Sequence, residues 1–298
     1  MAPIGSEFVK DETILIIGAT GKIGSRIVRQ LAAAGIRPRA LVRNRAKAEA
    51  IASLATPVLG DLMAPETLPE AFRGAERVFI LAPPTPEMEA LERHSIDAAV
   101  AAGARRIVYL SNFAATEGDQ DRFVHIHGMH QRLVATLAVD WSVLRFTRFM
   151  TSVPFVWSSI VNQGLLLEAG GSGIMSFFDP DEAAAIAVKA LIEDGHVGQT
   201  YKLTSNDAYT AADLATLLSR VVGRELKVFE GDPEAFREAL IANGAPAAHA
   251  PAMVRYFAKV AAGIYEPTGT AAKVLGRAPR AYADWLEQNP PVHIGRTQ

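Results

Sequence analysis

The chain has 298 residues, of which 49% are hydrophobic and 21% are charged, so it can form one large domain, or a large and a small one, around a buried core. Its formal charge is −2 and it contains no basic run, which argues against a nucleic-acid-binding surface. It has no cysteine, which excludes disulfides, thiolate metal sites and cysteine nucleophiles, and no apolar run of roughly 18 residues that could cross a membrane.

Short apolar runs alternate with amphipathic segments through the first half of the chain. Residues 13–17 are apolar and β-branched, which predicts a strand buried on both faces, and the helix that follows ends at Gly35. Further strands are expected at 39–42, 58–59, 78–82, 106–110 and 141–145, with helices at 46–54, 87–102 and around Leu133. This alternation predicts a doubly wound parallel sheet, a Rossmann-type α/β domain over residues 9–150.

The second half is less regular. Helices are expected at 182–192 and 211–222, and a strand at 200–204 is expected to return to the main sheet. Beyond residue 224 the pattern indicates further helices, interrupted by proline and glycine at Pro233, 244–246, Pro251 and Pro267. Residues 151–298 are therefore predicted to form a smaller, mostly helical cap that binds the substrate.

A glycine loop joins the first strand to the first helix. It contains Gly18, Ala19, Thr20, Gly21, Lys22, Ile23 and Gly24. In this strand–loop–helix context the three glycines are typical of a dinucleotide site, because they permit a tight turn, close approach of a pyrophosphate and close helix packing. The free N–H groups at the helix start favour phosphate oxygens. The alternative is a glycine-rich turn that binds nothing.

The end of the second strand bears on the choice between NAD and NADP. Val42 is followed by Arg43, Asn44 and Arg45, about 20 residues after the loop, where an NAD enzyme usually has a carboxylate. A guanidinium fits a 2′-phosphate, which a carboxylate would repel. We therefore expect NADP(H) in preference to NAD(H), with Arg43 as the main contact and Lys22, Arg45 or Lys47 assisting. A solvated basic turn is the alternative.

Several segments together resemble the NmrA-like group, atypical members of the short-chain dehydrogenase/reductase superfamily. They are residues 16–24, 40–44, Gly60-Asp61-Leu62 and 141–145 with Phe149-Met150. The resemblance covers residues 13–204 well and the remainder loosely. It implies further cofactor contacts, which are Asp61 and Leu62 beside the adenine, Ala82, Pro83 and Pro84 along the cofactor, Ser111 and Asn112 near the nicotinamide ribose, and Phe146 and Thr147 in the nicotinamide pocket.

The chain departs from that superfamily at its proton donor. Ordinary members use Tyr-x-x-x-Lys, whereas the corresponding positions here are Phe123 and His127. Phenylalanine cannot donate a proton, but His127 could bind the ribose or act as the acid, because histidine titrates near neutral pH. We therefore name His127 as the candidate catalytic residue. The alternative is a helix histidine that has no role.

Three other constellations give weaker indications. On a helix His127 and His130 would share a face without His125, which makes a poor metal site, so we expect no metal. Ser111 with His127 lacks the Gly-x-Ser-x-Gly context of a hydrolase. Asp179 and Asp181 are interpreted as a helix cap and first turn rather than as a catalytic pair.

Apolar side chains after the sixth predicted strand are candidates for contact with a flat aromatic substrate. They are Phe149, Met150, Phe155 and Trp157, which could equally belong to the core. The leading hypothesis is an NADPH-dependent reductase that transfers a hydride to a quinone, an azo or triarylmethane dye, or an enone. Such acceptors spread negative charge, so solvent or His127 can supply the proton.

Two alternatives remain open at this point. One is a non-catalytic sensor that binds NAD(P) and signals through a protein partner, as some members of the resembled group do. The other is an isomerase or a benzylic ether reductase with a general base near the nicotinamide. The chain is expected to be cytoplasmic, because it lacks cysteine and a signal-peptide pattern, and to be a monomer or a homodimer.

Overall fold

The computed structural model describes residues 13–151 and 154–289, which form two compact units. The first unit comprises the chain up to Phe146 together with Pro180–Lys202. The second comprises Thr147–Asp179 and the chain from Leu203 onward. The predicted domain boundary after residue 150 stays a prediction. Within the described ranges no helix combines the length and the apolar character needed to cross a bilayer.

Seven strands form the main sheet, in the order β10-β6-β5-β4-β1-β2-β3. The strands are β1 (Ile14–Ile16), β2 (Arg39–Val42), β3 (Thr56–Leu59), β4 (Arg77–Ile80), β5 (Arg106–Asn112), β6 (Asp140–Phe146) and β10 (Gln199–Leu203). The adjacent strands β6, β5, β4, β1, β2 and β3 all pair in parallel. The strand order reverses direction between β1 and β4, which confirms the predicted doubly wound Rossmann-type sheet.

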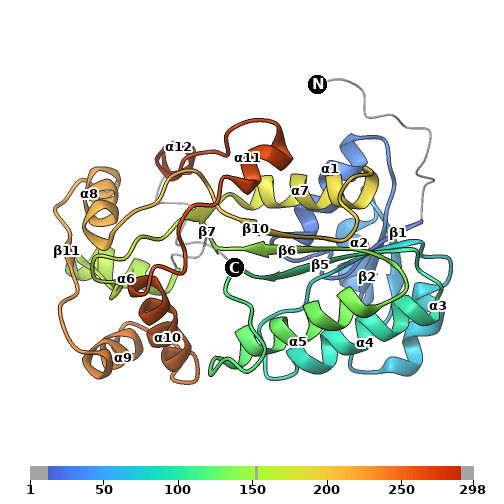
Figure 1. Cartoon of the computed structure of the whole chain (residues 1–298), viewed down its shortest axis with the longest axis horizontal. Coiled ribbons are helices and arrows are strands. Elements are labelled where there is room, and N and C mark those ends of the chain that lie inside the picture. Colours follow the sequence, from blue (N-terminus) through green and yellow to red (C-terminus); the bar gives the residue numbers. More distant parts are fainter. Residues whose placement is uncertain (1–12, 152–153, 290–298) are drawn as a thin grey trace. The chain divides into compact units, whose positions relative to one another are not determined.

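Helices cover both faces of this sheet (Figure 1), with α1 and α7 on one face and α3, α4 and α5 on the other. The helices of the first unit are α1 (Gly24–Ala33), α2 (Arg45–Ile51), α3 (Leu68–Phe72), α4 (Met88–Ala101), α5 (Arg122–Thr136) and α7 (Pro180–Ile192), with a 3₁₀ turn at Pro65–Thr67. Because both faces are covered, β1 is apolar and completely buried, and β4 beside it is apolar after its first residue.

The second unit is mostly helical, as predicted. Its helices are α6 (Pro154–Gln163), α8 (Ala211–Val222), α9 (Pro233–Ala242), α10 (Ala250–Ala261), α11 (Thr270–Leu275) and α12 (Tyr282–Gln288). Two-residue strands pair as β7 (Arg148–Phe149) with β9 (Phe177–Phe178) and as β8 (Leu165–Leu166) with β11 (Lys227–Val228). These short strands were not predicted, because two residues carry no periodicity.

A buried ion pair links two segments within this second unit. Arg148 donates to Glu168 at 2.9 Å, and their side chains are only 9% and 1% exposed. The guanidinium also lies over the ring of Phe177, 5.7 Å from its centroid. Burial raises the pKa of the Glu168 carboxyl, and Arg148 opposes that shift. A charge buried this deeply is tolerated because its partner is fixed beside it.

The start of α1 packs against the loop that precedes it at a distance only glycine allows. A Cβ atom on Gly24 would lie 2.2 Å from the carbonyl oxygen of Gly18. A Cβ on Gly21 would lie 3.1 Å from the same oxygen, which a small adjustment can relieve. Gly24 therefore sets how closely α1 approaches the end of β1.

We expect Gly24→Ala to destabilise the fold by about 1–3 kcal/mol, since the new methyl group must displace backbone atoms. Gly21→Ala, in the same loop, should cost less than about 1 kcal/mol. Urea denaturation of the two variants and the wild type measures both free energies of unfolding. Equal losses in the two variants would contradict the packing role assigned to Gly24.

Candidate functional site

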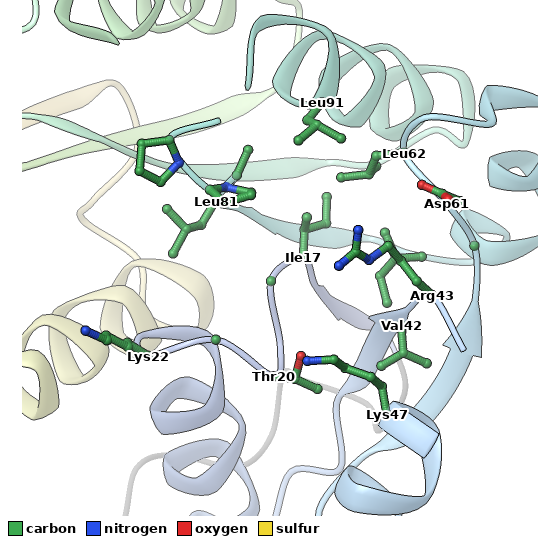
Figure 2. A pocket seen from close by; sticks show the side chains of 17 residues that line it. Ile17, Thr20, Lys22, Val42, Arg43, Lys47, Asp61, Leu62, Leu81 and Leu91 are labelled. Carbon is green, nitrogen blue, oxygen red and sulfur yellow. The ribbon is translucent and has the colours of Figure 1, made fainter. Parts of the chain in front are cut away.

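A cavity of about 510 Å³ opens in the first unit at the carboxyl ends of β1, β2, β3 and β4. Figure 2 shows the residues that line it. They come from the loop after β1, the β2–α2 junction, the segments after β3 and β4, and Leu91 of α4. Ligands of open parallel sheets bind at this edge, where the strand order reverses. The volume lies within the range of small-molecule and cofactor sites.

The glycine loop forms one wall of the cavity. Gly18 has φ +70°, a left-handed conformation that favours glycine, and a Cβ there would lie 3.0 Å from the carbonyl oxygen of Leu81. The N–H groups of Lys22, Ile23 and Gly24 find no acceptor among the described residues. Free N–H groups at the start of a helix form a binding site for anions such as a pyrophosphate.

Three cationic side chains line the same cavity. Lys22 comes from the glycine loop, whereas Arg43 and Lys47 come from the β2–α2 junction (Figure 2). All three are exposed, and none of their side chains forms a hydrogen bond or ion pair with a described residue. Among the lining residues Asp61 is the single carboxylate, and its Oδ1 accepts from the Met63 N–H at 2.9 Å. The cavity therefore suits a ligand that carries several negative charges.

Most of the predicted cofactor residues line this cavity. They are Gly18, Thr20, Gly21, Lys22, Arg43, Asp61, Leu62, Ala82, Pro83 and Pro84, together with the suggested helper Lys47. Ala19 and Ile23 are buried beside it, and Gly24 supports the loop. Asn44 caps α2 by accepting from the Lys47 N–H, and Arg45 pairs with Glu49 at 3.0 Å. These two side chains act on α2 and do not line the cavity.

Sequence reasoning missed six lining residues. Ile17, Leu41, Val42, Gly60 and Leu81 adjoin residues that were predicted, at the ends of β1, β2, β3 and β4, so the strand-end position itself was the available signal. Leu91 lies on α4, outside any motif, and nothing local to the sequence indicates its position. Together with Leu62 it gives the cavity an apolar side, to which a flat ring such as adenine would fit.

The residues predicted near the nicotinamide ribose lie at the ends of β5 and β6, outside the lining of the cavity. Ser111 is buried and donates to Gln131 of α5 at 3.3 Å. Asn112 accepts the Ala114 N–H through Oδ1 at 2.8 Å, which shapes the loop after β5. Phe146 is buried at the end of β6. Contact of these residues with a cofactor stays a prediction.

His127 lies in α5 with its side chain only 12% exposed. Its Nδ1 is 2.8 Å from the hydroxyl of Tyr109 on β5. Burial lowers the pKa of His127, and Glu92 of α4 partly opposes that shift. Phe123, one turn earlier, packs with Ala82, Met88 and Ile126. Because Ala82 also lines the cavity, this cluster connects its wall to α5.

The neighbouring histidines have structural partners. His125 accepts the Gly118 N–H at 2.8 Å, and Nδ1 of His130 lies 2.7 Å from Oε2 of Glu92. Within residues 13–151 and 154–289 no group of three or more His, Asp or Glu side chains could hold a metal ion. Asp179 pairs with Arg280 in the second unit at 2.9 Å, and Asp181 pairs with Arg26 in the first at 3.0 Å.

The predicted substrate residues belong to the second unit. Met150 and Trp157 are 0% and 8% exposed, as core residues are, and Phe149 is half-buried in β7. The side chain of Phe155 lies outside the described residues. Thr147 donates to the Ser176 carbonyl at 2.6 Å and helps to hold the second unit together. A substrate role for these residues stays a prediction.

Comparison with known proteins agrees with the geometry of the cavity. Residues 18–154 match a family model described as NAD(P)H-binding. The chain is 31% identical over 279 residues to the NAD(P)H azoreductase of Xenophilus azovorans, covering 92% of this chain and 96% of that one. Because the alignment covers 92% of this chain, the similarity extends over both units.

Two solved structures share the fold. The Citrobacter sp. triphenylmethane reductase complexed with NADP(H) superposes with a TM-score of 0.80 at 25% identity, covering 92% of this chain and 99% of that one. The Escherichia coli NADPH-dependent quinone oxidoreductase complexed with NADPH gives a TM-score of 0.85 at 24% identity, covering 93% and 99%. The chain is thus similar to NAD(P)H-dependent oxidoreductases over nearly its whole length.

The lowered pKa of His127 predicts a pH dependence of stability. Above pH ~6.5 the ring is neutral in both the folded and the unfolded chain. As the pH falls below that value, the unfolded chain binds the proton first, so stability is lost. We expect the free energy of unfolding to fall more steeply between pH 7 and pH 5 in the wild type than in His127→Asn, by up to about 1.4 kcal/mol per pH unit.

Urea denaturation at several pH values checks this difference. The two proteins share every other residue, so the comparison isolates His127 and the charges that face it. Those are Glu92, His130, Arg145 and Asp121. Parallel stability curves for the two proteins would contradict the assignment.

Proposed function

This chain belongs to the NmrA-like group of atypical short-chain dehydrogenases/reductases and is an NAD(P)H-dependent oxidoreductase, and we propose that it uses NADPH to reduce conjugated or aromatic acceptors. The observation that carries the proposal is the cavity at the sheet edge, whose three cations and loop N–H groups have no partner in the described part of the chain. A dinucleotide pyrophosphate supplies the anion for the loop. A 2′-phosphate supplies a second anion for Arg43 and Lys47.

The class of acceptor follows from the missing acid. None of the six tyrosines is followed four residues later by lysine, so the chain lacks the usual Tyr-x-x-x-Lys pair. Reduction of a simple ketone creates an alkoxide, which needs a strong donor beside it. Quinones, azo compounds and enones instead spread the charge, and a cationic triarylmethane becomes neutral on accepting hydride. The names of the azoreductase, quinone oxidoreductase and triphenylmethane reductase relatives support this class.

The nicotinamide cofactor supplies the hydride when it is bound, and the chain supplies the binding and the orientation. Lys22 and the loop N–H groups would hold the pyrophosphate, Arg43 and Lys47 the 2′-phosphate, and Leu62 with Leu91 the adenine face. We place His127 as the residue that transfers a proton to the reduced acceptor. The proposed setting is the cytoplasm, since the lack of cysteine suits a reducing compartment, and the proposed assembly is a monomer or a homodimer.

Arg43→Asp should weaken NADPH binding by well over tenfold while changing NADH binding much less, because a charge-assisted phosphate contact becomes repulsive. Fluorescence titration with the two cofactors measures both affinities. Arg45→Asp is the matched control, since it makes the same charge change at a side chain that pairs with Glu49 and does not line the cavity. If both variants weaken NADPH equally, Arg43 has no specific role in phosphate recognition.

The acceptor class is tested by following NADPH oxidation with a quinone, an azo dye, a cationic triarylmethane and a simple ketone. We expect turnover of the conjugated acceptors to exceed that of the ketone by at least about 100-fold, the order of rate lost without an oxyanion donor. Flat traces for every conjugated acceptor, despite NADPH binding, would sink the reductase proposal. Fast turnover of the ketone would contradict the argument from the missing tyrosine.

A further inference from the structure

A chain of polar side chains crosses the interior of the first unit and ends at His127. The hydroxyl of Tyr109 lies 2.7 Å from Oε2 of Glu92 and 2.8 Å from Nδ1 of His127. Glu92 and Tyr109 are both 0% exposed. His130 occupies the far end, with its Nδ1 at 2.7 Å from Oε2 of Glu92. The network spans α4, β5 and α5 and is absent from the sequence predictions.

The hydroxyl of Tyr109 has one proton and two hydrogen-bond partners. It can donate to Glu92 only if it accepts from a protonated Nδ1 of His127. It can donate to Nδ1 only if the carboxyl of Glu92 carries a proton and donates to the hydroxyl in turn. In either arrangement every contact along the chain is a good hydrogen bond, and His130 can donate to Glu92 in both.

The two arrangements can hold the same number of protons. One has an ionised Glu92 and an imidazolium at His127. The other has a protonated Glu92 and a neutral His127 whose proton lies on Nε2. A shift of two protons along Glu92, Tyr109 and His127 converts one into the other. The first arrangement pairs two buried charges, with Nδ1 of His127 3.6 Å from Oε1 of Glu92, whereas the second contains no buried charge.

We propose that Glu92, Tyr109 and His127 form a proton relay that delivers a proton from Nε2 of His127 to the reduced acceptor. This inference rests on the proposed reductase function and names the route of its proton. Nε2 forms no hydrogen bond with a described residue, and the ring keeps 12% of its surface exposed. Ile126, the next residue along α5, packs with Ala82 of the cavity wall.

Each step of the relay balances. An acceptor that has gained a hydride would carry an anionic centre. The Nε2–H bond of His127 breaks and its proton bonds to that centre. The proton of Tyr109 moves to Nδ1, and the proton of Glu92 moves to the Tyr109 oxygen. Glu92 is left as a carboxylate and His127 as the neutral Nδ1–H tautomer. Water then returns a proton to Nε2 at the exposed edge of the ring, and the shift along the chain reverses.

The pKa directions agree with this geometry. Burial beside Glu92 raises the pKa of Tyr109 well above its ordinary value, so the hydroxyl passes protons on without ionising as a free acid. Burial lowers the pKa of His127, which disfavours a stored imidazolium. His127 is therefore the catalytic residue of the relay, while Tyr109 and Glu92 act through it as positioning residues that set its tautomer and replenish its proton.

The test compares two acceptors in Tyr109→Phe. Hydride addition to an azo bond leaves a basic nitrogen that must be protonated, whereas hydride addition to a cationic triarylmethane gives a neutral product without any proton. We expect the ratio of azo-dye kcat to triarylmethane kcat to fall at least ~100-fold in Tyr109→Phe, the lower end of the range for a lost general-acid contribution. Glu92→Gln, which keeps the shape but cannot relay a proton, should lower the ratio similarly.

Tyr201→Phe provides the matched control. Tyr201 is the other tyrosine of the described first unit that is bonded to a histidine, its hydroxyl lying 3.0 Å from Nδ1 of His196 near β10. In Tyr201→Phe the ratio of azo-dye kcat to triarylmethane kcat should equal that of the wild type. An unchanged ratio in Tyr109→Phe, or equal losses with both acceptors, would overturn the relay and leave the network a structural role.

The relay and the proposed function can fail separately. A wild-type protein that reduces neither dye overturns the proposed function. In that case the hydrogen-bond network is judged by ¹⁵N NMR of the histidine rings at neutral pH. A changed Nδ1 resonance of His127 in Tyr109→Phe and in Glu92→Gln, with none in Tyr201→Phe, supports the proton coupling that the relay requires. Unchanged His127 resonances in all three variants overturn it.

Discussion

The approach of Gly24 to the carbonyl oxygen of Gly18 is the constraint on which the site depends. Because Gly24 has no Cβ atom, α1 can start close to the end of β1, where a larger residue would collide with the Gly18 carbonyl. In this arrangement the N–H groups of Lys22, Ile23 and Gly24 have no acceptor within residues 13–151 and 154–289. The cations of the β2–α2 junction then complete a site for anions on a scaffold of buried strands.

On the opposite face of the same sheet, polar side chains are buried between the helices and the strands. There α4 and α5 cover β5 with a mainly apolar layer, yet Glu92, Tyr109, His127 and His130 lie within it. Buried polar groups are costly unless they satisfy one another, and here a continuous row of hydrogen bonds does so. The apolar cluster of Ala82 and Ile126 brings this row near the cavity wall. The proposed cofactor site and the proposed proton relay thus share the apolar contacts of one layer.

Much of the first unit could be predicted because its signals are local. A strand buried on both faces is a continuous apolar run, as at residues 13–17, and the glycine loop has a recognisable spacing. Other features have no such signal. The helix α3 is only five residues long and contains Pro69, so its pattern is too short to detect. The two-residue strands of the second unit depend on tertiary pairing alone.

The polar row illustrates the same limit within the candidate site. Tyr109 lies in a strand that is indistinguishable from core by sequence, and Glu92 occurs in the charged stretch Glu92-Arg93-His94, which is typical of an exposed helix face. Only the packing of α4 against α5 shows that Glu92 faces inward. His127 was singled out from its spacing to Phe123, but its partners come from elements 18 and 35 residues away, a separation that no local pattern reports.

The return of the chain to the first unit has a consequence for its integrity. The segment Pro180–Lys202 follows 33 residues of the second unit, yet it supplies α7 and most of edge strand β10. α7 packs on α1, and its residues Ile186, Ala187 and Leu191 are completely buried. Ending the chain at Phe146 would therefore uncover an apolar sheet face beside the glycine loop. The dinucleotide-binding unit is not a detachable N-terminal half: its fold is completed only after the chain has already begun the other unit.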